Sequence, residues 1–129
     1  MKKQVFVESG QSHTQGPDAT VANGFAYFAA LRGVDPATGR ITSDDPEVQT
    51  RFAMENLKAA LAAAGCSLND VVKVNIYMKH WDDRNAFNKV YREYWPEDQL
   101  PARAAVQILA VGGDERSRFM MDVVAAVPS

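Results

Sequence analysis

The chain has 129 residues, of which 47% are hydrophobic, and a formal net charge of −2. This length predicts one domain spanning residues 1–129, with enough apolar side chains for one core. The acidic isoelectric point, near 5.6, gives no general attraction to nucleic acid or to anionic membranes. The only cysteine, Cys66, excludes an intrachain disulfide and a multi-cysteine metal site.

The sequence also lacks the signals for secretion, membrane insertion, zinc binding and phosphate binding. The basic start, residues 1–8, has no apolar stretch long enough for a secretion signal, and no run could span a membrane, so we expect a cytoplasmic protein. His13 and His80 lack the spacing of a zinc site, and Gly112-Gly113 does not introduce a helix as a phosphate loop would. We therefore expect no metal and no cofactor.

The first half of the chain predicts short strands and one long helix. Strands are expected at residues 5–7 and 25–31, separated by a polar loop, and at 40–42 after a proline-led turn. Residues 43–47, SDDPE, combine an N-cap candidate, a first-turn proline and acids that the helix dipole favours. This helix should extend to Ala64, because apolar residues recur at helical spacing and Gly65 provides a stop.

The second half alternates strands with one more helix. Residues 72–78 alternate apolar and polar side chains, which is typical of a strand with unlike faces. A second helix should begin at Asp82 or Asp83 and end before Pro96, with its apolar stripe made by Phe87, Val90, Tyr91 and Tyr94. Strands at 104–110 and 119–127 complete an α+β sandwich with two helices on one face of a sheet. The other face, apolar and uncovered, predicts self-association.

Arg103 opens a segment, residues 100–108, that otherwise resembles a buried apolar strand. Arginine is seldom buried without a partner, and its planar fork of donors suits a carboxylate or a phosphate. Pro101 stiffens the approach, and the small Ala104 and Ala105 leave room for a ligand beside the guanidinium. The segment therefore predicts an anion pocket; the alternative is a surface ion pair with an acid such as Glu97 or Asp98.

Asp122 lies within a second apolar strand, FMMDVVAA. A carboxylate in such a setting needs a polar partner or a bound proton, and either condition can support activation of water. The alternatives are an outward-facing side chain or a structural ion pair with Arg116 or Arg118.

Several short motifs, in this order, are similar to those of the RidA/YjgF family of reactive-intermediate deaminases. They span nearly the whole chain and comprise Gly16-Pro17, Asp35-Pro36-Ala37-Thr38-Gly39, Ala63-Ala64-Gly65, Asn88, Pro101-Ala102-Arg103 and Asp122. The resemblance implies a chorismate-mutase-like fold, with a mixed six-stranded sheet and two helices on one face. It also implies a homotrimer whose sites lie between subunits.

The same resemblance implies roles for individual residues. Arg103 stands at the clamp for a substrate carboxylate, Asp122 where relatives carry a glutamate that positions water, and Asn88 near the substrate. Three places depart from the family: Ala29-Ala30 replace Ser-Gly, Asp18 replaces a frequent tyrosine, and Ala105 replaces a frequent cysteine. These departures predict a divergent substrate or weak activity.

The favoured function is cofactor-free hydrolysis of small enamine or imine carboxylic acids to a keto acid and ammonia. Such compounds already hydrolyse in water, so proximity and orientation are sufficient catalysis. The alternative is a trimeric protein that binds or senses a small carboxylate without turnover, which the departures at Asp18, Ala29 and Ala105 favour. The endoribonuclease or translation-inhibitor activity reported for some relatives is disfavoured by the acidic isoelectric point.

Overall fold

The computed structural model describes residues 2–7 and 16–129. Its strands form one sheet in the order β1-β2-β3-β6-β4-β5, in which β4 and β5 are parallel and the other neighbours antiparallel. The strands are β1 (Lys3–Val5), β2 (Ala19–Ala22), β3 (Phe25–Leu31), β4 (Val71–Met78), β5 (Ala102–Gln107) and β6 (Phe119–Ala126). The α-helices of this part of the chain are α1 (Pro46–Ala63) and α2 (Arg84–Tyr91), and the 3-10 turns are η1 (Leu68–Asp70), η2 (Trp81–Asp83), η3 (Arg92–Tyr94) and η4 (Glu97–Gln99).

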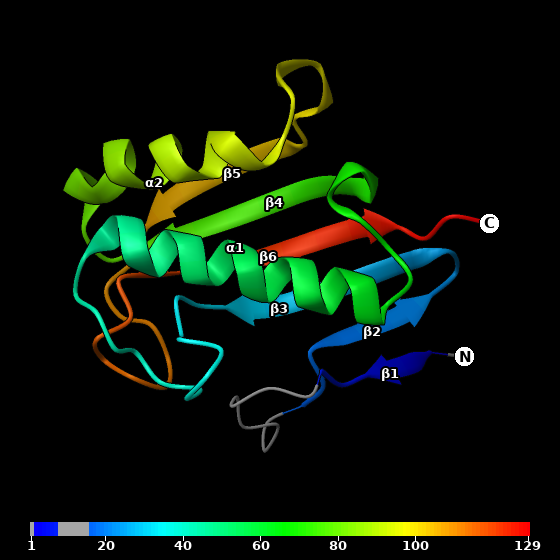
Figure 1. The fold of residues 1–129 in the computed structure, drawn as a ribbon, viewed down its shortest axis with the longest axis horizontal. Helices are drawn as coiled ribbons and strands as arrows, with labels where there is room; N and C mark the ends of the chain where they lie inside the picture. The colour runs from blue at the N-terminus through cyan, green and yellow to red at the C-terminus, as the bar shows by residue number, and fades with distance from the viewer. Residues whose placement is uncertain (1, 8–15) are drawn as a thin grey trace.

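Both α-helices lie on the same face of the sheet, which confirms the expected two-layer α+β architecture (Figure 1). Helix α1 starts as its sequence predicts: the Asp45 carboxylate accepts hydrogen bonds from the Glu47 and Val48 N–H groups, and Pro46 occupies the first turn. Its apolar stripe packs with that of α2 over β3, β4 and β6, and side chains such as Leu57, Phe87, Ile76 and Met121 are fully buried there. None of the described helices is long and apolar enough to cross a membrane.

The N-terminal half differs from expectation in three strands. Strand β1 ends at Val5, where a strand was expected to begin. Strand β2 was not expected, although Asn23 and Gly24, with φ of 53° and 82°, form the two-residue turn that joins it to β3. The strand expected at residues 40–42 is absent. The turn at residues 35–40 instead forms one isolated antiparallel bridge, between Asp35 and Arg40.

The C-terminal half differs in how its ends are built. A register shift between Val71 and Lys73 turns Val71 inward and leaves Val72 45% exposed, so Val71 takes the buried place expected for Val72, and the expected alternation holds only from Lys73 onward. Asp83 precedes α2 but makes no side-chain cap, because its carboxylate pairs with Arg118 instead. Strand β5 pairs only with β4, at the edge of the sheet, and is therefore mostly exposed rather than buried.

The face of the sheet opposite the helices carries exposed apolar side chains. Phe25, Tyr27 and Val106 are 41%, 47% and 49% exposed, and their strand partners place all three on this open face. Asn75 and Tyr77 of β4 and Asp122 of β6 lie on the same face. The open face thus combines apolar surface with a small set of polar groups.

Candidate functional site

Arg103 is held by helix α2. It pairs with the buried Val74 across the β4–β5 ladder, so its side chain lies on the helix face of the sheet. Its Nη2 donates to Asn88 Oδ1 over 2.7 Å. Its Cζ lies 4.8 Å from the ring centroid of Tyr91 and 5.8 Å from that of Phe87, within cation–π range. The structure thus brings Arg103 and Asn88 into direct contact.

The guanidinium keeps donors available for a ligand. Within residues 2–7 and 16–129, no carboxylate lies within ion-pair distance of Arg103, so the expected alternative of a pair with Glu97 or Asp98 is wrong. The side chain is exposed, and arginine has five N–H donors. Burial raises the pKa of Tyr91 to about 12, against the lowering effect of the Arg103 charge, so the ring under the guanidinium stays neutral. The Arg103 guanidinium is thus a fixed positive charge with donors available to bind an anion.

Asp122 is held by donors from both neighbouring strands. Its Oδ2 accepts from the Tyr77 hydroxyl over 3.0 Å, and its Oδ1 accepts from the Ala30 N–H over 3.4 Å. The bond to Asp122 raises the pKa of the Tyr77 phenol, which therefore remains a donor at neutral pH. The alternative ion pairs are wrong, because Arg116 pairs with Asp44 and Arg118 with Asp83.

A hollow of about 510 Å³ surrounds Asp122 on the open face. It brings Asp122 together with Asp18 and Ala29, two positions that the family resemblance singled out, and with Asn75, which sequence reasoning missed. Beside it, Ala30 has a φ of +56° within an irregularity between Phe28 and Leu31, and this conformation turns its N–H toward Asp122. The Asp18 carboxylate is itself engaged, since its Oδ2 accepts from the Val7 N–H over 2.7 Å.

A single chain does not bring Arg103 and Asp122 together. Arg103 is paired with Val74, whereas Asp122 is paired with Asn75, the next residue of β4. Successive residues of a strand point to opposite faces, so the guanidinium and the carboxylate lie on opposite sides of the sheet. The alanines of β5 divide in the same way: Ala105 shares the helix face with Arg103, and Ala104 shares the open face with Asp122.

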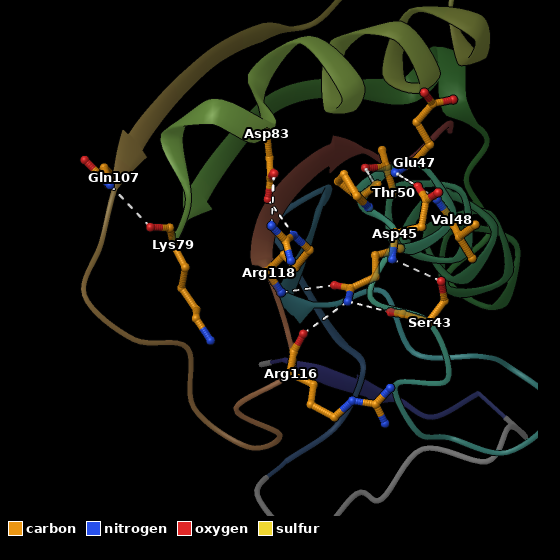
Figure 2. Close-up of polar contacts among 12 residues, drawn as sticks. Ser43, Asp45, Glu47, Val48, Thr50, Lys79, Asp83, Gln107, Arg116 and Arg118 are labelled. Atoms are coloured by element: carbon orange, nitrogen blue, oxygen red, sulfur yellow. Dashed lines mark hydrogen bonds and ion pairs between the residues drawn. The ribbon is translucent and has the colours of Figure 1, made fainter.

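A buried polar framework ties the start of β6, the strand that carries Asp122, to the two helices. Gln49 of α1 is fully buried; its Nε2 donates to the Ser43 and Arg116 carbonyls over 2.8 and 3.1 Å, and its Oε1 accepts from the Arg118 N–H over 3.0 Å. Figure 2 shows the Arg118 side chain directed at Asp83, at the start of α2. The start of β6 is thereby tied to both helices.

The other candidates do not join either group. His13 lies outside the described residues, and His80 is exposed. Burial raises the pKa of the Cys66 thiol, which favours the protonated, unreactive form. In the described ranges, no three His, Cys, Asp or Glu side chains cluster closely enough to hold a metal ion.

Residues 11–127 match the family described as endoribonuclease L-PSP. The chain belongs to this family, which is the RidA/YjgF family. A RutC family protein of Pyrococcus horikoshii is 44% identical over 110 residues, which are 84% of this chain and 86% of that protein. The 3-aminoacrylate deaminase RutC of Acinetobacter baylyi is 34% identical over 116 residues, 88% of this chain and 91% of that protein. The crystal structure of the yeast protein YEO7 is 25% identical, with a TM-score of 0.89 over 99% of this chain and 100% of that one.

Proposed function

We propose that this RidA/YjgF family protein hydrolyses the C=N bond of small enamine or imine carboxylic acids. The observation that carries the proposal is the guanidinium of Arg103, which Asn88 and Tyr91 orient and which has no carboxylate partner among the described residues. A guanidinium held in this way binds a carboxylate through two parallel N–H donors. The relative that is 34% identical and named as a 3-aminoacrylate deaminase supports the same substrate class.

In the proposed mechanism, Arg103 anchors the substrate carboxylate and Asp122 orients a water molecule toward the imine carbon. An enamine first tautomerises to the imine. The carboxylate of Asp122 accepts a proton from that water as its oxygen bonds to carbon, the C=N electron pair moves to nitrogen, and the proton passes from Asp122 to that nitrogen to give the carbinolamine. The hydroxyl proton of the carbinolamine then passes by the same carboxylate to the nitrogen as the C–N bond breaks, which releases ammonia and leaves the keto acid. Because the uncatalysed reaction already proceeds in water, these residues contribute mainly proximity and orientation.

The proposed site is composite. Arg103 and Asp122 lie on opposite faces of the sheet in one chain, so a small substrate reaches both only if a second copy supplies one of them. The exposed Phe25, Tyr27 and Val106 on the open face support packing against such a copy. We propose that the assembly is the homotrimer that the family resemblance implies, with each site between two subunits.

The test is an imine-clearance assay. An amino-acid dehydratase or oxidase generates the imine in place, and its disappearance is followed with and without the protein. We expect acceleration by the wild-type chain and a loss of about 2 to 5 kcal/mol of binding in Arg103→Ala, as for other desolvated charge pairs. Wild-type turnover by Arg103→Ala would refute the role of Arg103.

A second candidate function is binding of a small carboxylate without turnover. Ala29, which lines the hollow beside Asp122 together with Asp18, provides no side-chain hydroxyl for a substrate, and this favours the second candidate. Calorimetric binding of a keto acid by a chain that does not accelerate imine hydrolysis would support it. The family description also names an endoribonuclease, and cleavage of RNA that fails in Arg103→Ala would replace both proposals.

A further inference from the structure

Tyr77 has no role in the mechanism proposed above, yet it contacts Asp122 directly. It lies on β4 two residues after Asn75, which is the residue opposite Asp122 in the β4–β6 ladder. Its hydroxyl donates to Asp122 Oδ2 over 3.0 Å, while the Ala30 N–H reaches Oδ1 over 3.4 Å. Each oxygen of the carboxylate therefore has one donor, and the two donors come from the strands on either side of β6.

Two donors from opposite sides fix the orientation of a carboxylate. The terminal torsion of aspartate is broad, so without contacts the plane of the carboxylate is free to rotate. A donor on each oxygen sets that plane and leaves the remaining lone pairs for a water molecule in the hollow. Other titratable groups on this side are Tyr27, Lys73 and Asp18. Tyr27 and Lys73 make no described hydrogen bond or ion pair with Asp122, and Asp18 Oδ2 accepts from the Val7 N–H.

We propose that Tyr77 is a positioning residue, whose hydroxyl holds Asp122 in the orientation that directs water at the imine carbon. The role rests on the proposed deaminase function. Tyr77 transfers no proton in this role. The raised pKa of its phenol keeps the hydroxyl protonated, so it serves as a donor throughout the neutral range.

Tyr77→Phe tests the role because it removes only the hydroxyl. We expect kcat for imine hydrolysis to fall about tenfold, as for loss of one hydrogen bond to a charged group, with KM within about twofold. Tyr94→Phe is the matched control. It removes another tyrosine hydroxyl that donates to a carboxylate, that of Glu55, over 2.8 Å, on a surface away from Asp122. Its kcat and KM should equal those of wild type.

A second measurement reads the contact without using activity. Ultraviolet titration of tyrosinate should show Tyr77 ionising at lower pH in Asp122→Asn than in wild type, since the amide carries no negative charge. The difference spectrum between each protein and its Tyr77→Phe derivative isolates this one tyrosine.

The outcomes separate the two proposals. Wild-type kcat in Tyr77→Phe, a loss carried by KM, or an equal loss in Tyr94→Phe would overturn the positioning role and leave the deaminase proposal intact. A wild-type chain that does not accelerate imine hydrolysis would overturn both. An unchanged tyrosinate titration in Asp122→Asn would overturn the contact on which the role depends.

Discussion

Mixing two inactive variants tests whether the site is shared between copies. Arg103→Ala removes the anchor and Asp122→Asn removes the base, while neither substitution adds bulk. Strand β4 separates the strands that carry these residues, so the two backbones lie about 10 Å apart and the side chains point away from each other. Neither pure variant then has an intact site. A mixed assembly has one wherever the Arg103 donor is an Asp122→Asn chain and the Asp122 donor is an Arg103→Ala chain.

The expected magnitude follows from random assembly. In an equal mixture, half of the Arg103 positions and, independently, half of the Asp122 positions are intact at each interface, so about one quarter of the sites are complete. This fraction is the same for any closed ring of copies. The two chains, carrying different affinity tags, are co-expressed and purified through both tags. Purification through both tags removes the pure assemblies, so the activity per site should be at least this fraction of wild type.

The result that would refute a shared site is equally direct. If the doubly purified assembly clears imine no faster than the two pure variants, no intact site has formed between copies. Circular dichroism of each pure variant checks that the chains are folded, and size-exclusion chromatography checks that the mixture is assembled. An active pure variant would instead show that the substituted side chain is not needed.

Four further predictions concern single residues. Arg103→Lys keeps the charge but loses the fork and the aromatic stacking, so kcat/KM should fall about tenfold or more, and a value equal to wild type would contradict bidentate capture. Ala30→Gly relieves a φ of +56° and should raise the free energy of unfolding by about 0.5 to 1 kcal/mol in urea denaturation, whereas a decrease would contradict the strain. Gln49→Ala leaves three partly buried backbone groups without their side-chain partner and should lower that free energy by about 2 to 4 kcal/mol, against less than about 0.5 for the exposed Gln99→Ala. Cys66 should react with iodoacetamide more slowly at pH 7 than a small free thiol does, because burial raises its pKa, and equal rates would contradict this.

The elements that sequence reasoning placed well are those with local signals. Helix α1 is specified by Asp45 and Pro46 at its start and by Gly65 after its end. Each of these residues acts on the helix turn next to it, so its effect can be recognised in the local sequence. Strand β2 had an equally local signal in Asn23-Gly24, but its short, alanine-rich sequence does not alternate clearly. The exposure of β5 had no local signal, because it depends on β5 being an edge strand.

The candidate site was predictable only in part, for a related reason. Arg103 and Asp122 stand out because a charge in an apolar strand is costly, and that cost is visible in one sequence. Their partners are not visible in this way, since Tyr77 is 45 residues from Asp122 and Asn75 is unremarkable until the β4–β6 register is known. Alternation along β4 already placed Asn75 and Tyr77 on one face. Alternation did not predict that β6, the strand of Asp122, lies next to β4.

The separation of Arg103 from Asp122 has a physical benefit if the site is shared. On the same face and within reach, a guanidinium and a carboxylate form an ion pair, and an incoming substrate would have to break it. The sheet prevents this within one chain, so among the described residues Arg103 has only the neutral Asn88 and two aromatic rings as partners, and Asp122 only a hydroxyl and an N–H. Each group is thus oriented without being neutralised. In the proposed assembly, a second copy would bring the two charges to one cleft, with the substrate acid between them.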